Sequence, residues 1–279
     1  MSRRVLIAGC GDVGRRVAQR LLAQGDEVWA LRRSPGVDDG SGIRWLRGDL
    51  GDPSSLDALP DRLDHLVYLP APDARDEAAY RSVFVDGPRH LLAALEAASL
   101  RRVLLVSSSA VYGEHGDAWV DECTAPDPPG FNGRILLEAE QWLARQPVPL
   151  TVLRLAGLYG PGRLQLLERL RTGQARVPRK GPHWANRIHV DDAAAAIVHL
   201  LGLDEPLSLC LGVDNTPLPL DVLYDELARL LGVPPPADGA APPGVGSKRL
   251  SNARLRASGF VPRWPDAREG YAALLAGAG

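Results

Sequence analysis

Three glycines near the start of the chain have the type and spacing suited to holding phosphate groups. Gly9, Gly11 and Gly14 read G-x-G-x-x-G and directly follow the apolar run 5–8. The first glycine of such a loop permits a tight turn, the second leaves room for a pyrophosphate, and the third lets the next helix pack on the strand. Unpaired N–H groups at the start of that helix face the phosphates. The spacing therefore predicts a dinucleotide site, whose expected contacts in this stretch are Gly9, Gly11, Asp12, Val13 and Gly14.

The residues around the glycines decide whether the motif indicates a dinucleotide site, because a lone G-x-G-x-x-G is a weak signal. Val13, Val17 and Leu21 follow at helical spacing and form an apolar stripe. Gly25 stands where a C-terminal helix cap is expected, and a second apolar run covers residues 28–31. A strand, a helix and a second strand in this order predict one βαβ unit with the glycines in its first turn.

Two arginines, Arg32 and Arg33, end the second predicted strand. In a site that prefers NAD, an Asp or Glu about 20 residues after the glycines holds the ribose hydroxyls. A guanidinium at that place can instead pair with the extra phosphate of NADP through two parallel hydrogen bonds. The alternative is a pair of solvated surface charges. We expect NADP as the cofactor, with NAD as the alternative, and assign Arg32 and Arg33 to its binding.

Further predicted strands alternate with helical patterns along the first half of the chain. Apolar runs occupy residues 43–46, 65–69, 102–107 and 150–155. This alternation predicts an α/β fold, a doubly wound parallel sheet of Rossmann type with right-handed crossovers. Ligands of such sheets bind beyond the carboxyl ends of the strands. The further cofactor contacts expected along this edge are Asp49, Leu50, Leu69, Pro70 and Ser107.

The pattern changes after the predicted strand at 150–155. A glycine-containing loop at 156–162 follows, and helical patterns at 191–203 and 220–231 come later. The chain therefore divides into an NAD(P)-binding Rossmann domain and a small C-terminal α/β substrate-binding lobe that is partly interleaved with the sheet. We expect these two parts to be residues 1–155 and residues 156–279.

Composition narrows the class of partner. A net charge of −2 does not indicate nucleic-acid binding, and no stretch approaches the roughly 18 consecutive apolar residues of a membrane span. The first residues do not have a signal-peptide pattern. Cys10, Cys123 and Cys210 are widely spaced, which suits neither a disulfide framework nor a zinc site. We expect a cytoplasmic protein, monomeric or homodimeric, that acts on a small molecule and binds no metal, nucleic acid or membrane.

Three further stretches complete a recognisable pattern. Residues 107–113 read S-S-S-A-V-Y-G, residues 158–162 read L-Y-G-P-G after Leu153-Arg154, and residues 187–192 read R-I-H-V-D-D. Together with the glycine loop, they resemble the extended short-chain dehydrogenases/reductases, which include the NAD-dependent epimerase/dehydratase group. The resemblance covers nearly the whole chain and implies a nucleotide domain with a small substrate lobe. It also implies that Ser108 assists catalysis and that Arg187 contacts substrate phosphates.

One part of the family pattern is replaced, so that the chain resembles an atypical member. The family's acid–base pair is a Tyr with a Lys four residues later, and no Tyr in this chain has a Lys at that spacing. Aligning Glu140-Gln141 with the family's usual Glu-Gln places Asn132 and Leu136 at the two positions. An amide and an alkyl side chain supply no group that titrates near neutral pH. The sequence therefore supports nucleotide binding more strongly than the family's standard chemistry.

Two residues near these motifs are further candidates for the site. Arg134 lies close to the replaced Tyr and is expected either to hold a substrate anion or to be a solvated charge at a helix start. Tyr112 of the V-Y-G stretch is similar to a family residue that packs beside the cofactor. We take it, with Ser108, as a candidate catalytic residue that donates a proton.

Three functions are compatible with these residues. The first is an NADP(H)-dependent oxidoreductase that reduces a carbonyl or oxidises an alcohol, with Ser108 hydrogen-bonded to the carbonyl oxygen. The second is a protein that senses NADP(H) and signals to a partner without chemistry, which the missing Tyr–Lys pair favours. The third is epimerase or dehydratase chemistry on a nucleotide sugar, which needs a base in place of the Tyr.

Overall fold

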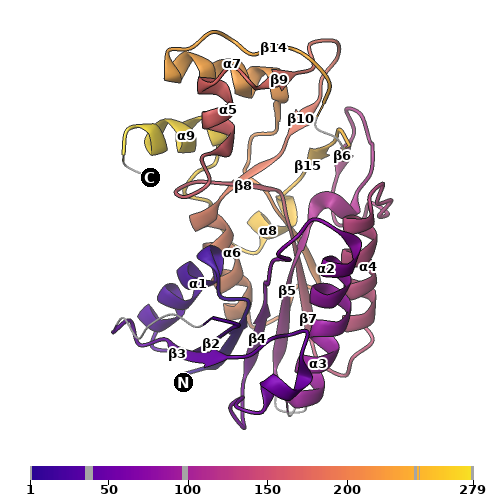
Figure 1. Cartoon of the computed structure of the whole chain (residues 1–279), viewed down its shortest axis with the longest axis vertical. Helices are drawn as coiled ribbons and strands as arrows, with labels where there is room; N and C mark the ends of the chain where they lie inside the picture. Colours follow the sequence, from indigo (N-terminus) through magenta and orange to yellow (C-terminus); the bar gives the residue numbers. More distant parts are fainter. Residues whose placement is uncertain (1, 35–39, 96–99, 242–243, 245, 278–279) are drawn as a thin grey trace. The chain divides into compact units, whose positions relative to one another are not determined.

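The computed structural model describes residues 2–34, 40–95, 100–241, 244 and 246–277 (Figure 1). Internal contacts divide the chain into two compact units, and each unit is assembled from segments that are distant in the sequence. The first unit consists of Met1–Val111, Gly130–Arg154 and Ile197–Cys210, and the second of Tyr112–Pro129, Leu155–Ala196 and Leu211–Gly279. The predicted division at residue 155 stays a prediction.

The largest sheet has seven strands in the order β12-β7-β5-β4-β1-β2-β3. Its strands are β1 (Arg4–Ala8), β2 (Glu27–Arg32), β3 (Arg44–Arg47), β4 (His65–Tyr68), β5 (Arg102–Ser108), β7 (Leu150–Leu155) and β12 (Leu209–Gly212). Strand β1 pairs in parallel with both β2 and β4, while β2 pairs in parallel with β3 and β4 with β5. The chain thus builds outward from β1 in both directions, and the predicted Rossmann-type α/β fold is confirmed.

Helices cover both faces of the sheet in the first unit (Figure 1). Helix α1 (Asp12–Ala23) lies on one face, and α2 (Glu77–Arg81), α3 (Gly87–Ala94) and α4 (Phe131–Leu143) lie on the other. Because water reaches neither face, the strands carry nearly continuous apolar runs. Val5, Leu6 and Ile7 of β1 are fully buried, and this packing fixes the end of β1 from which the glycine loop departs.

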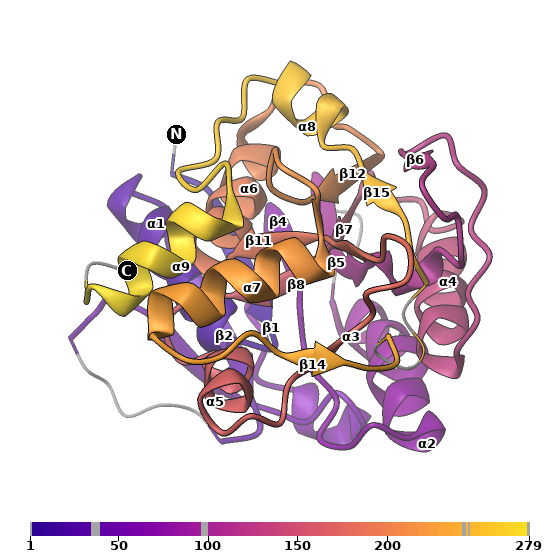
Figure 2. The same cartoon turned by 90° about the horizontal axis from the view of Figure 1, so that it is seen from above.

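The second unit is built from helices and short strand pairs. Helix α7 (Leu220–Leu231) packs against α5 (Gln165–Arg171) and α9 (Ala267–Leu275), and Figure 2 shows these helices side by side. The other helices are α6 (Val190–Gly202), which extends into the first unit, and α8 (Ala253–Ala257). The strand pairs are β6 (Trp119–Val120) with β15 (Arg249–Leu250), β8 (Gly157–Tyr159) with β11 (Arg187–His189), β9 (Arg176–Val177) with β14 (Ala237–Asp238), and β10 (Trp184–Ala185) with β13 (Leu218–Pro219).

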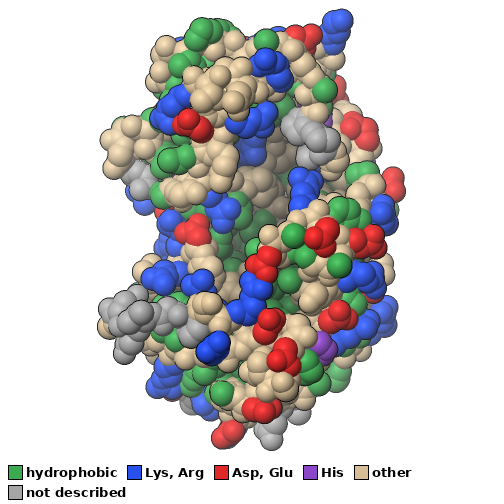
Figure 3. All heavy atoms as spheres, in the orientation of Figure 1, with side chains coloured by type: hydrophobic (Ala, Val, Ile, Leu, Met, Phe, Trp, Pro, Cys, Tyr) green, Lys and Arg blue, Asp and Glu red, His purple; other side chains and the backbone are tan. Residues whose placement is uncertain are grey.

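The surface carries charges of both signs. On the face drawn in Figure 3, acidic and basic side chains are interspersed over the region of α2 and α4. Within the part of the chain that the structure describes, no helix combines the length and the apolar character needed to cross a membrane.

Candidate functional site

The first glycine of the loop is required by the backbone around it. Gly9 has a φ of +88°, a conformation that side chains strongly disfavour. Its N–H donates to the Leu31 carbonyl oxygen at 3.1 Å. A Cβ atom built on Gly9 would lie 2.3 Å from the Cα of Pro70. The turn after β1 is therefore held between the ends of β2 and β4, and only glycine fits there.

The other two glycines have different surroundings. A Cβ on Gly14 would lie 3.3 Å from the Ile7 side chain, which shows how closely α1 packs on β1. A Cβ on Gly11 would meet no described atom within 4 Å beyond its chain neighbours. Gly11 is the N-cap of α1, and no side chain caps the first N–H groups of the helix. This cradle fits the pyrophosphate of a dinucleotide.

The two predicted cofactor arginines differ in their contacts with the described residues. Arg33 forms two parallel hydrogen bonds with the Asp73 carboxylate, one of them at 2.5 Å. This pairing raises the pKa of Arg33 and lowers the pKa of Asp73. Arg32 is half-buried, and its side chain has no hydrogen bond or ion pair to another described residue. Burial raises the pKa of the Cys10 thiol to about 11, and Arg32 opposes this rise, which places its charge near the glycine loop.

Strand β4 and the segment after β3 supply the next predicted contacts. The N–H of Leu69 donates to the Ala8 carbonyl oxygen at 2.9 Å, so the end of β4 is bound to the start of the glycine loop. Asp49 accepts a hydrogen bond from the Gly51 N–H at 2.9 Å and so caps its own turn. The Leu50 carbonyl oxygen lies 2.8 Å from Nδ1 of His90. Their contacts to a cofactor stay predictions.

Two serines at the end of β5 have separate roles. The Ser107 hydroxyl donates to Glu140 Oε1 at 2.5 Å, and Glu140 is held in turn by Arg154, whose Nη2 lies 2.5 Å from Oε2. All three side chains are buried. The Ser108 hydroxyl oxygen is half-buried and accepts from the Ala110 N–H at 3.2 Å. Ser108 therefore keeps its own proton available for donation, while Ser107 belongs to an internal charged network.

Sequence reasoning did not identify this network. The sequence does contain an indication of it. Glu140 lies among the apolar residues of the buried face of α4, and Arg154 lies in the apolar strand β7. A charged residue at such a position indicates a partner of opposite charge. Predicting that these two residues pair requires knowing how α4 packs against β7, and the local sequence pattern does not contain this information.

Helix α4 carries Asn132 and Leu136, which are predicted to stand at the family's Tyr and Lys positions. Leu136 is buried, with 4% of its surface exposed, and Asn132 is half-buried in the first turn. Arg134 is exposed in the same turn. The helix therefore presents an amide and a surface guanidinium at its start, and its buried face is apolar at Leu136.

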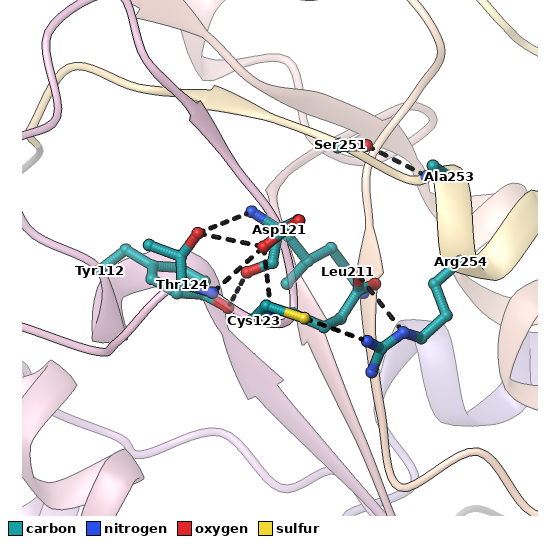
Figure 4. Close-up of polar contacts among 9 residues, drawn as sticks. Tyr112, Asp121, Cys123, Thr124, Leu211, Ser251, Ala253 and Arg254 are labelled. Atoms are coloured by element: carbon teal, nitrogen blue, oxygen red, sulfur yellow. Dashed lines mark hydrogen bonds and ion pairs between the residues drawn. The ribbon is translucent and has the colours of Figure 1, made fainter.

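Tyr112 and its partners lie in the second unit. Its buried hydroxyl donates to the Asp121 carbonyl oxygen at 3.0 Å. Asp121 also accepts from the N–H groups of Cys123 and Thr124 through Oδ1, at 2.9 and 3.1 Å (Figure 4). Tyr112 thus anchors a turn that the Asp121 carboxylate closes, and its predicted role as a proton donor stays a prediction.

A buried lysine holds the backbone next to Tyr112. Lys248 donates through Nζ to the carbonyl oxygens of Tyr112 and Gly113 at 3.3 Å and of Gly246 at 3.0 Å. Burial lowers the pKa of this ammonium group. The sequence did not indicate this role, because the lysine lies far downstream of the V-Y-G stretch and no motif connects the two.

Arg187 is half-buried on β11, also in the second unit. Its carbonyl oxygen accepts from the Asp214 N–H at 2.7 Å. The Asp214 side chain is 2% exposed, and burial raises its pKa to about 8. Its Oδ2 atom has no hydrogen-bond partner among the described residues. Arg187 thus lies near a buried carboxyl group, and its contact with a substrate phosphate stays a prediction.

Neither the thiols nor the acidic residues form a metal site within the described ranges. Cys10, Cys123 and Cys210 form no disulfide with a described residue, and no three His, Cys, Asp or Glu side chains of the described residues are placed together to hold an ion. Asp192 instead accepts from the backbone N–H groups of Arg263 and Trp264, at 2.8 and 2.9 Å.

Known proteins are similar to this chain over nearly its full length. Protein YeeZ of Escherichia coli K12 is 30% identical over 280 residues, which cover 95% of this chain and 97% of YeeZ. A Methylobacillus flagellatus structure, provisionally named an NAD-dependent epimerase/dehydratase, is 42% identical with a TM-score of 0.84 and covers 99% of both chains. The UDP-glucose 4-epimerase of Thermus thermophilus, solved with NAD, has the same fold at 22% identity, with a TM-score of 0.79 and 98% coverage of both chains. The family model described as NAD dependent epimerase/dehydratase matches residues 5–207, and the chain belongs to this family.

Proposed function

We propose that the protein is an NADP(H)-dependent oxidoreductase that interconverts a carbonyl and an alcohol on a small substrate, sugar-type substrates included. The observation that carries the proposal is the open space beside Gly11 at the start of α1. A side chain at this position would meet no other part of the described protein, so packing does not explain the glycine. The approach of a pyrophosphate does explain it.

The residues that would hold the cofactor are those of the first βαβ unit. The N–H groups of Val13 and Gly14 would donate to the pyrophosphate, aided by the positive end of the α1 dipole. Arg32 would pair with the 2′-phosphate, because its guanidinium lies near the loop and has no other partner among the described side chains.

The bound nicotinamide would supply or accept the hydride. Ser108 would donate its hydroxyl proton in a hydrogen bond to the substrate oxygen, with Oγ oriented by the Ala110 N–H. Such a donor stabilises the negative charge that develops on the oxygen during hydride transfer. We assign the transferred proton to water, since the Tyr112 hydroxyl already donates to Asp121.

A second candidate is an NADP(H)-sensing protein without turnover. It is favoured by Asn132 and Leu136, which stand where the family has its acid–base pair and provide no titrating group. General acid–base help is worth about 10²–10⁴ in rate, so its loss fits a protein that binds the nucleotide and does no chemistry with it.

One experiment separates these functions. The parent protein and Ser108→Ala are titrated with NADPH by nicotinamide fluorescence and then assayed for NADPH consumption over a panel of carbonyl substrates. The oxidoreductase predicts equal binding by both proteins and turnover that falls at least about 10-fold in Ser108→Ala. Binding with no turnover above the variant's background supports the sensor. An absence of NADPH and NADH binding contradicts both functions.

A further inference from the structure

The ion pair between Arg33 and Asp73 joins the two strands that flank the glycine loop. Arg33 directly follows β2, and Asp73 lies five residues after the end of β4. Both strands pair in parallel with β1, one on each side, so their carboxyl ends emerge on either side of the loop that follows β1. The pair therefore connects the segments next to the place where the ribose of a dinucleotide is expected.

The same two strand ends are bound to the loop backbone. The N–H of Gly9 donates to Leu31 near the end of β2, and Leu69 after β4 donates to Ala8. The Arg33–Asp73 pair is thus the side-chain part of a connection that the backbone makes on both sides of β1.

The side chains of Arg33 and Asp73 are exposed, unlike those of an ion pair that stabilises the folded state. The side chains of Arg33 and Asp73 are 56% and 67% exposed. An ion pair in such surroundings contributes little to folding, because solvent screens it. Separating the two side chains therefore costs the protein little free energy, and a phosphate group can replace the carboxylate as the partner of Arg33.

The pair also changes the charge that a nucleotide phosphate would meet. Arg32 and Arg33 stand side by side, but Asp73 neutralises the second, and Asp49 adds a further negative charge that acts on Arg33. Of these two arginines, Arg32 is the one whose guanidinium has no ion pair with a described residue.

We propose that Asp73 is a specificity-determining residue that holds Arg33 in reserve, so that the 2′-phosphate of NADP(H) must displace the Asp73 carboxylate to gain its second guanidinium. This inference rests on the proposed NADP(H) site and deepens it. Arg32 binds the phosphate without any rearrangement. Asp73 competes with the phosphate for Arg33 and so reduces the preference of the protein for NADP(H) over NAD(H). NAD(H) lacks the phosphate and leaves the pair closed.

The test removes the carboxylate charge and keeps its shape. Asp73→Asn releases Arg33 and is expected to strengthen NADPH binding by about 3- to 10-fold, while NADH binding stays within about 2-fold of the parent. Glu27→Gln is the matched control, because Glu27 forms a similarly exposed pair with Arg44 at the amino end of β2. It makes the same change in net charge away from the proposed site and leaves both affinities unchanged.

A third variant shows whether Arg33 carries the effect. In an Arg33→Ala background, Asp73→Asn is expected to change NADPH affinity by less than about 2-fold. Adenosine 2′,5′-bisphosphate and 5′-AMP, which differ by the 2′-phosphate, are titrated by calorimetry on the same proteins and should reproduce the NADPH and NADH results. Melting temperatures without ligand confirm that these surface variants fold.

The outcomes are separable. Equal changes in NADPH and NADH affinity, the same gain in Glu27→Gln, or a full gain without Arg33 would overturn the role of Asp73 while leaving the nucleotide site in place. If the parent and Asp73→Asn bind neither NADPH nor the bisphosphate, the proposed function fails, and the role of Asp73 fails with it.

Discussion

Gly9 and Pro70 are packed so closely that a Cβ atom on the glycine would lie 2.3 Å from the proline Cα. Two residues further along the loop, a Cβ on Gly11 would meet no described atom within 4 Å beyond its neighbours in the chain. One glycine of the motif is therefore required by the fold, whereas the other is best explained by a ligand. This difference makes the two positions a natural pair of test and control.

Gly11→Ala is expected to fold and to lose nucleotide binding. An added Cβ would meet no described atom within 4 Å beyond its chain neighbours, so the change in unfolding free energy should stay within about 1 kcal/mol. The added methyl group would occupy the approach of the pyrophosphate, and NADPH affinity should fall at least about 10-fold. Urea unfolding and fluorescence titration measure the two quantities. In Gly9→Ala the main effect should instead be a loss of unfolding free energy. Unchanged NADPH binding by Gly11→Ala would refute the assignment of Gly11 to the pyrophosphate site.

Arg32→Glu should reverse the cofactor preference. The carboxylate repels the 2′-phosphate and can accept hydrogen bonds from the ribose hydroxyls, as acidic residues at this place do in NAD sites. In a thermal-shift assay, stabilisation by NADPH should shrink and stabilisation by NADH should grow. Arg62→Glu makes the same charge change just before β4, at the opposite edge of the sheet, and should leave both shifts as they are. Equal shifts from the two nucleotides on the parent protein would argue against an NADP(H) site.

Arg154→Met should destabilise the first unit strongly. The substitution leaves the buried Glu140 carboxylate with Ser107 but without its guanidinium, and breaking a buried pair on one side costs about 3–5 kcal/mol. Adding Glu140→Gln removes the uncompensated charge and should recover part of the loss. Urea-induced unfolding at neutral pH measures both variants, and a loss below about 1 kcal/mol for Arg154→Met would show that the network is not coupled to folding.

Asp214 should make the protein less stable as the pH rises. Its pKa is about 8 in the folded protein and 3.8 as the reference value, so between these limits the folded state keeps a proton that the unfolded state has lost. The unfolding free energy therefore falls across this window, by up to about 1.4 kcal/mol per pH unit, and levels off above it. Asp214→Asn keeps an oxygen to accept the Thr216 N–H and should be the more stable protein at pH 8, with little difference near pH 4. Asp204→Asn, at an exposed position, should follow the parent at both values, and a parent protein whose stability does not change over this range would contradict the role of Asp214.

The parts of the structure that sequence reasoning predicted are those that local physics determines. The glycine loop, the buried strands and helix α7 follow from backbone freedom and from apolar periodicity within a few residues. Helix α4 shows the limit, since it begins at Phe131, four residues before the apolar pair Ile135 and Leu136 that marks its buried face. Its first turn contains Asn132 and Gly133, which are weak helix formers, and is supported by an edge-on contact between Phe131 and Tyr80 at 5.4 Å.

The predicted site shows the same limit. The positions of Arg32 and Arg33 could be read from the chain, but the partner of Arg33 is 40 residues away and depends on which strands flank β1. The direction of the Ser107 hydroxyl likewise depends on Glu140, which reaches it from another element. Long-range partners of this kind decide which residues of a recognised motif stay available to a ligand.

The burial of Lys248 has a practical consequence for chemical labelling. The chain contains two lysines, and the ammonium of Lys248 is enclosed by three carbonyl oxygens with 3% of the residue exposed, whereas Lys180 is exposed. Amine-directed dyes or cross-linkers therefore attach to the folded protein at Lys180, apart from the terminal amine. Labelling at Lys248 would report that the backbone around Tyr112 has opened, so a single mass-spectrometric measurement can follow the integrity of that region.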